Sequence, residues 1–67
     1  MTITFYKPQK CLCSMLDLFP TVISDNGNYI KVYEINTLFQ QDNTLVIGSG
    51  KEQAIIDTRL FTYYDVI

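Results

Sequence analysis

Histidine and tryptophan are both absent from this sequence of 67 residues, and cysteine occurs only twice. Without an imidazole side chain, the chain lacks the commonest general base and every catalytic triad that depends on histidine. The two cysteines, Cys11 and Cys13, stand one residue apart. A disulfide between them would close no long loop, so the kind of crosslink that stabilises small secreted domains is excluded. We therefore expect a protein that is not an enzyme.

The cysteine pair is also too small a ligand set for a metal. Structural zinc takes about four thiolate or imidazole ligands, and catalytic zinc takes about three. One chain would have to recruit carboxylates, of which Asp17 is the nearest, or two chains would have to pool their cysteines across a dimer axis. On a helix, side chains two residues apart point about 200° away from each other, which disfavours a redox pair. We expect no metal and no cofactor, and we interpret one cysteine as a small core residue and the other as lying near the surface.

Long apolar runs and clusters of positive charge are missing as well. No segment approaches the roughly 18 apolar residues of a transmembrane helix, and the N-terminus lacks the pattern of a signal peptide. Lysine and arginine number 5 against 7 aspartates and glutamates, for a net charge of -2. Because the cations are scattered, no basic patch is available to neutralise several phosphates. We expect a cytoplasmic protein with no membrane partner, and nucleic acid is disfavoured as a partner.

What the chain does contain is apolar and β-forming. Hydrophobic residues make up 48% of the sequence and charged residues 18%, which is the composition of a folded chain. Valine, isoleucine, threonine, phenylalanine and tyrosine number 28, whereas alanine, leucine, methionine, glutamate, glutamine, lysine and arginine number 20. The length fits one domain, residues 1–67, with a small core and a thin margin of stability.

The first third of the chain predicts a strand and a short helix. Residues 2–7 alternate polar and apolar side chains up to Pro8, which is typical of a strand. In the next segment apolar residues recur one helical turn apart, Pro8 is tolerated in a first turn, and Pro20 is a stop. We interpret residues 9–19 as a short helix, with a strand as the alternative.

The Asn26-Gly27 dipeptide is the clearest local signal, because it favours the tight turn of a β-hairpin. We expect strands over residues 21–24 and 28–35 on its two sides. The faces of the second strand then carry Ile30 and Val32 on one side, and Tyr29, Lys31, Tyr33 and Ile35 on the other.

The last third contains one clear strand and one ambiguous segment. Residues 44–48 predict a strand between an Asp-Asn turn and a Gly-Ser-Gly loop, whereas residues 37–43 break the pattern. Ser49 and Glu52 have the spacing of a capping box, and apolar residues recur at helical intervals within residues 51–67, so a helix is the alternative there. The β-branched and aromatic residues of this segment favour a strand that bends near Thr58. The sum is an α+β or mainly β fold: a small antiparallel meander of about four to five strands with one short helix near residues 9–19. Such a sheet has to curl into a barrel, pack under the helix or bury its open face against another chain.

Aromatic residues on the predicted strands indicate an interaction surface. Tyrosine combines a large apolar ring with a polar tip, which is why it is favoured at protein interfaces. The same rings could stack on the bases of single-stranded nucleic acid, but each neighbouring cation has an acidic residue close by in the sequence. We therefore predict a protein-binding site with apolar anchors and register-setting charges, formed by Tyr29, Lys31, Tyr33, Asp57, Arg59, Phe61, Tyr63, Asp65 and Ile67.

These features together predict a non-enzymatic module that binds a larger host protein. Small size and the lack of catalytic groups are typical of an inhibitor or accessory factor of a phage or mobile element, which would act by steric blocking. A small β-barrel that binds single-stranded nucleic acid is the alternative from another class, and a self-assembling structural protein is a third. A homodimer or other homo-oligomer is compatible with each, because a chain of this length gains stability by association.

Overall fold

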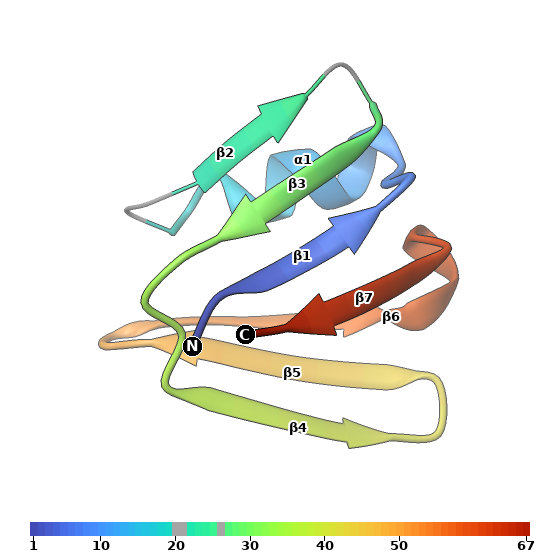
Figure 1. Ribbon diagram of the computed structural model, residues 1–67. Coiled ribbons are helices and arrows are strands. Elements are labelled where there is room, and N and C mark those ends of the chain that lie inside the picture. Colours follow the sequence, from blue (N-terminus) through green and yellow to red (C-terminus); the bar gives the residue numbers. More distant parts are fainter. Residues whose placement is uncertain (20–21, 26) are drawn as a thin grey trace.

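The computed structural model describes residues 1–19, 22–25 and 27–67. Within them, strands predominate over a single short α-helix and one turn of 3₁₀-helix (Figure 1). The predicted α+β or mainly β class is therefore confirmed. In chain order the elements are β1 (Ile3–Tyr6), α1 (Lys10–Leu16), β2 (Val22–Asp25), β3 (Tyr29–Val32), β4 (Thr37–Gln41), β5 (Thr44–Ser49), β6 (Glu52–Asp57), η1 (Thr58–Leu60) and β7 (Tyr63–Val66).

The strands form two antiparallel sheets rather than one meander. Sheet A has the order β2-β3-β1-β7, and sheet B has the order β4-β5-β6 (Figure 1). Seven strands in the described residues replace the four to five that the sequence predicts. The prediction of a single meander is wrong because β1, the first strand, lies between β3 and β7 instead of at an edge. Only sheet B, among the described strands, keeps the meander order.

The predicted short helix is present as α1, within residues 9–19. Its two buried residues, Leu12 and Leu16, are one turn apart and face the core. Cys13 packs against the core at intermediate depth, whereas Cys11 is exposed, and both thiols are free. One cysteine therefore contributes to the core and the other lies at the surface, as expected. The predicted helix stop, Pro20, lies outside the described residues.

The predicted hairpin is present and joins β2 to β3 in antiparallel register. Gly27 occupies its turn with a φ of 77°, a conformation that glycine adopts without a steric penalty. Two residues of this prediction, Asn26 in the turn and Thr21 at the start of the first strand, lie outside the described residues.

β3 ends at Val32, three residues earlier than the alternation predicts. Glu34 has a φ of 59°, in the left-handed region, so the extended conformation stops there. Ile35, which the alternation places beside the tyrosines, is instead turned into the core and fully buried. Within β3 itself the alternation holds, since Ile30 is buried and the residues on either side of it are half-buried.

Sheet B begins with a strand that the sequence pattern does not indicate. β4 lacks an apolar face, because only Leu38 among its side chains is partly buried and the others are exposed. The predicted turn at Asp42-Asn43 then leads into β5. The loop after β5 is shorter than predicted, since Gly48 and Ser49 belong to the strand.

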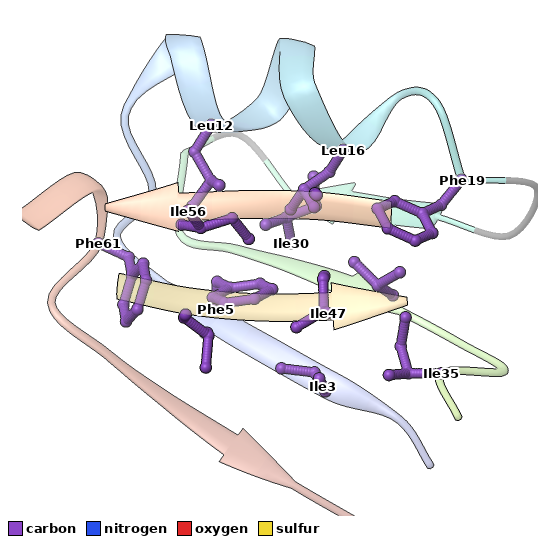
Figure 2. Packing of buried hydrophobic residues seen from close by; sticks show 13 residues of the cluster. Ile3, Phe5, Leu12, Leu16, Phe19, Ile30, Ile35, Ile47, Ile56 and Phe61 are labelled. Atoms are coloured by element: carbon purple, nitrogen blue, oxygen red, sulfur yellow. The ribbon is translucent and has the colours of Figure 1, made fainter. Parts of the chain in front are cut away.

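The C-terminal segment forms strands rather than the alternative α-helix, and the predicted bend near Thr58 is present. β6 ends at Asp57, η1 turns the chain, and β7 follows. Asp57 caps this turn: its Oδ1 accepts a hydrogen bond of 2.9 Å from the backbone N–H of Arg59. The turn interrupts the alternation, so Phe61 points into the core, where Figure 2 shows it beside Phe5.

The core lies between the inner faces of the two sheets, with α1 covering one side of it (Figure 2). Phe5, in the central strand β1, is fully buried and meets Phe61 edge to face, with ring centroids 5.0 Å apart. The hydroxyl of Tyr64 in β7 donates a hydrogen bond of 2.6 Å to Oε1 of Gln40 in β4, which links an edge of sheet A to an edge of sheet B. The buried apolar residues are Ile3, Phe5, Leu12, Leu16, Phe19, Ile30, Val32, Ile35, Leu45, Ile47, Ala54, Ile56 and Phe61.

Candidate interaction face

Sheet A turns one face to the core and the other outward, and the outward face collects aromatic residues from three strands. Because Phe5 of β1 points inward, its neighbours Thr4 and Tyr6 point outward. β1 pairs with β3 on one side and with β7 on the other. Each of these two outward residues therefore has one outward neighbour on β3 and one on β7. The result is two rows across the strands, Tyr29-Tyr6-Tyr63 and Lys31-Thr4-Asp65, which together we call the tyrosine face.

The side chains of the tyrosine face pack against one another. Tyr6 and Tyr63 stack nearly parallel, with ring centroids 4.4 Å apart and an interplanar angle of 14°. Nζ of Lys31 lies 5.6 Å from the ring centroid of Tyr29, at the distance of a cation–π contact. Thr4 is only 3% exposed although it is on the outward side, so its neighbours cover it. The most open of the three rings is Tyr63, which is 53% exposed.

The formal charges on the tyrosine face cancel, since it carries one ammonium group, Lys31, and one carboxylate, Asp65. Partial burial is the largest cause that raises the pKa of Tyr6. The pKa is raised further by the negative charge of Asp65, by the hydrogen bond between Tyr6 and Asp65, and by the neighbouring phenols. The phenol of Tyr6 therefore stays protonated at neutral and mildly alkaline pH. It remains a neutral hydrogen-bonding group at the centre of the face.

Six of the predicted site residues lie on the tyrosine face or next to it. The face itself contains Tyr29, Lys31, Tyr63 and Asp65. Tyr33 directly follows β3 and is half-buried, and Ile67 directly follows β7 and is exposed. Both lie beyond the same end of the face, next to the start of β1.

The other three predicted site residues lie elsewhere. Phe61 is 8% exposed and packs against Phe5, so its predicted role as an exposed anchor is wrong. Asp57 and Arg59 lie at the bend between β6 and β7 and pair with each other, with Oδ2 and Nη2 2.6 Å apart. All three lie apart from the tyrosine face because the predicted single strand is divided: β6 belongs to sheet B, β7 belongs to sheet A, and the bend with η1 connects them.

The Asp57–Arg59 pair gives the bend a pH dependence. Side-chain and backbone hydrogen bonds from Arg59 lower the pKa of Asp57 from 3.8 to about 2. Because folding lowers this pKa, the carboxylate stabilises the folded bend above pH 3.8, and the contribution is lost as the pH falls to about 2. NMR titration of the carboxyl carbons should therefore give Asp57 a midpoint of about 2.

The matched control for this titration is Asp57→Asn, which keeps a capping oxygen but removes the charge. The difference in stability between this variant and the wild type should shrink as the pH falls from 3.8 to about 2. An unshifted midpoint of 3.8 for Asp57 would show that the pair does not form in solution.

Sequence reasoning missed the two central residues of the tyrosine face, Thr4 and Tyr6. Their alternation with Ile3 and Phe5 is visible in the sequence and already places them on one side of the first strand. The missing information is the identity of the neighbouring strands, because pairing between segments far apart in the chain leaves no local signal.

The tyrosine face combines three phenol rings with one ammonium group, one carboxylate and one hydroxyl group. In the part of the chain that the structure describes, no three side chains of the metal-ligating types gather, and no pocket is present. The described helices include none that is long and apolar enough to cross a membrane. Comparisons with protein-family models, with curated proteins and with solved structures found no match.

Proposed function

We propose that this chain is a non-enzymatic, cytoplasmic module that binds a larger protein through the tyrosine face. One observation carries the proposal: three tyrosines from three neighbouring strands form a continuous row, with a balanced pair of charges alongside. Bound in this way, the domain covers part of its partner's surface and blocks it sterically. This is the mode of action of a small inhibitor or accessory factor carried by a phage or mobile element.

The chemistry of the tyrosine face supports protein recognition. A tyrosine ring buries a large apolar area at a low cost in conformational entropy, and its hydroxyl can still hydrogen-bond at the rim. The stacking of Tyr6 on Tyr63 and the contact of Lys31 with Tyr29 order these side chains before a partner arrives. Such ordering reduces the entropy lost on association. Lys31 and Asp65 supply polar contacts that set the orientation of the partner.

The alternative, a platform for single-stranded nucleic acid, fits this geometry less well. Base stacking requires free ring faces along a positively charged groove. Here one face of Tyr6 is covered by Tyr63, and the ring of Tyr29 lies under the ammonium group of Lys31. The one lysine of the face is also balanced by Asp65, so the face provides little attraction for phosphates.

Tyr63→Ala is expected to weaken binding to the partner about 30-fold, because truncation of an interface hot-spot tyrosine costs about 2 kcal/mol. Tyr63 suits the test because it is the most open ring of the face and lies on an edge strand, away from the core. The measurement starts with capture from a cell lysate on the immobilised protein. The co-purifying protein is then identified and titrated against the wild type and the variant.

The matched control is Leu18→Ala, since Leu18 is 65% exposed and follows α1, outside the tyrosine face. This variant should bind the partner as the wild type does. Unchanged affinity of Tyr63→Ala would contradict the use of the tyrosine face. Oligonucleotide binding that falls steeply with salt would favour the nucleic-acid alternative, and turnover of any substrate would contradict a non-enzymatic role.

A further inference from the structure

A second surface, on sheet B, is open to solvent and apolar at its centre. Leu45 and Ile47 of β5 point into the core, so Val46 between them points outward. The register sets Val46 between Phe39 of β4 and Ile55 of β6. Phe39 is 56% exposed and Ile55 is 66% exposed. These three residues, which we call the apolar row, cross the whole width of the sheet.

The positions around the apolar row are polar and almost uncharged. One flanking row consists of Thr37, Gly48 and Gln53, and the other consists of Gln41, Thr44 and Asp57. Asp57 is the only charged residue on this outward side of sheet B, whose three strands the structure describes throughout, and Arg59 pairs with it. An apolar centre within a polar rim that carries almost no charge is the composition found in the middle of protein interfaces.

We propose that a second copy of this chain covers this face of sheet B in a two-fold symmetric dimer. An axis parallel to β5 sets the two sheets face to face with Val46 close to the axis. Phe39 then packs over the partner's Ile55, and the symmetry repeats the contact, so a large ring meets a smaller branched side chain twice. In the same arrangement Asp57 faces the partner's Gln41, whose amide can donate a hydrogen bond to it, and no like charges meet.

The charge and the area of this face both bear on which molecule covers it. A surface made for a strongly charged partner carries an excess of the opposite charge, whereas the single carboxylate here is already paired with Arg59. Three strands about 4.8 Å apart and about 17 Å long form a patch well below the roughly 800 Å² that each partner buries in a standard interface. We therefore expect a weak, reversible dimer in the micromolar to millimolar range.

This dimer goes beyond the proposed function and does not depend on it. The tyrosine face and the apolar row lie on different sheets, and each points away from the core that the sheets share. Association through sheet B therefore leaves both tyrosine faces of the dimer accessible. Two faces in one particle would increase the avidity for a partner that presents two binding sites.

Sedimentation at rising protein concentration tests the dimer. For the wild type the average mass should rise from 7.7 kDa towards twice that value. Phe39→Ser removes a ring from both symmetric contacts and should raise the dissociation constant at least about tenfold. Ile55→Thr keeps a β-branched residue in β6 and should also weaken the dimer, which controls for a folding defect in the first variant.

The control variant is Leu18→Ser, at a similarly exposed position outside sheet B, and it should associate as the wild type does. A wild type that is monomeric up to about 1 mM would overturn the proposal, and so would growth beyond a dimer or association unaffected by Phe39→Ser. The dimer and the binding of a partner by the tyrosine face can be disproved independently. Tyr63→Ala changes only sheet A and should leave self-association unchanged.

Discussion

Phe5→Ala is expected to leave the chain largely unfolded at room temperature. Phe5 lies in a central strand of sheet A, is fully buried, and packs with Phe61 and Tyr64 at ring-centroid distances of 5.0 and 6.1 Å. Truncating a buried phenylalanine to alanine costs about 3–5 kcal/mol, through lost burial and the cavity that remains. A single core in a domain below about 70–80 residues rarely supplies more than about 3–5 kcal/mol of stability. The substitution therefore removes most or all of the free energy of unfolding.

Far-UV circular dichroism and urea unfolding measure this effect. Phe39→Ala makes the same chemical change at a position that is 56% exposed, and it should change the free energy of unfolding of the dilute monomer by less than about 1 kcal/mol. Phe5→Leu keeps much of the buried volume, so it should destabilise less than Phe5→Ala and remain folded. Equal destabilisation by Phe5→Ala and Phe39→Ala would contradict the position of Phe5 in the core.

Leu16→Ala is expected to cost about 2–5 kcal/mol and to loosen α1 from the body of the domain. The helix has seven residues, which is too short for a helix to be stable by itself in water. Leu12 and Leu16 are its fully buried residues and attach it to the core (Figure 2). Loss of one of them removes a large share of the apolar contact on which the helix depends.

Urea unfolding together with amide hydrogen exchange measures this second effect. The amides of α1 should lose protection in Leu16→Ala relative to those of β1 and β3, because the helix loses its anchor while the strands keep their ladders. Leu18→Ala, at a position that is 65% exposed, should leave both readouts close to the wild type. If the two leucine variants behaved alike, burial of Leu16 would not be what secures the helix.

The sequence predicts those elements whose signals are local. The turn dipeptide that ends at Gly27 identifies the β2–β3 hairpin, and one-turn spacing of apolar residues identifies α1. The bend at Thr58 is also expected, and the structure supplies its cause, the Asp57 cap of η1. β4 is not predicted from the sequence because neither of its faces has an apolar pattern. Among its side chains only that of Leu38 is partly buried.

The arrangement of the elements depends on contacts between segments far apart in the chain, and the candidate site depends on this arrangement. Tyr29 and Tyr63 can be assigned to strand faces by counting along the chain, but Tyr6 joins them only because β1 lies between β3 and β7. Phe61 is misplaced by the same counting, since it lies between η1 and β7, outside any strand, where alternation does not apply. The apolar row around Val46 likewise requires β4, which has to be recognised before Phe39 has a position.

The pairing of β1 with β7 has a consequence for biosynthesis. These strands come from opposite ends of the chain, with Ile3 opposite Val66 and Tyr6 opposite Tyr63. Contacts of such large sequence separation are slow to form, because a long loop has to close before they give any stabilisation. β1 leaves the ribosome before β7 and acquires this neighbour only after residues 63–66 have emerged. Until then β1 lacks this neighbour, so sheet A is completed only after β7 has emerged.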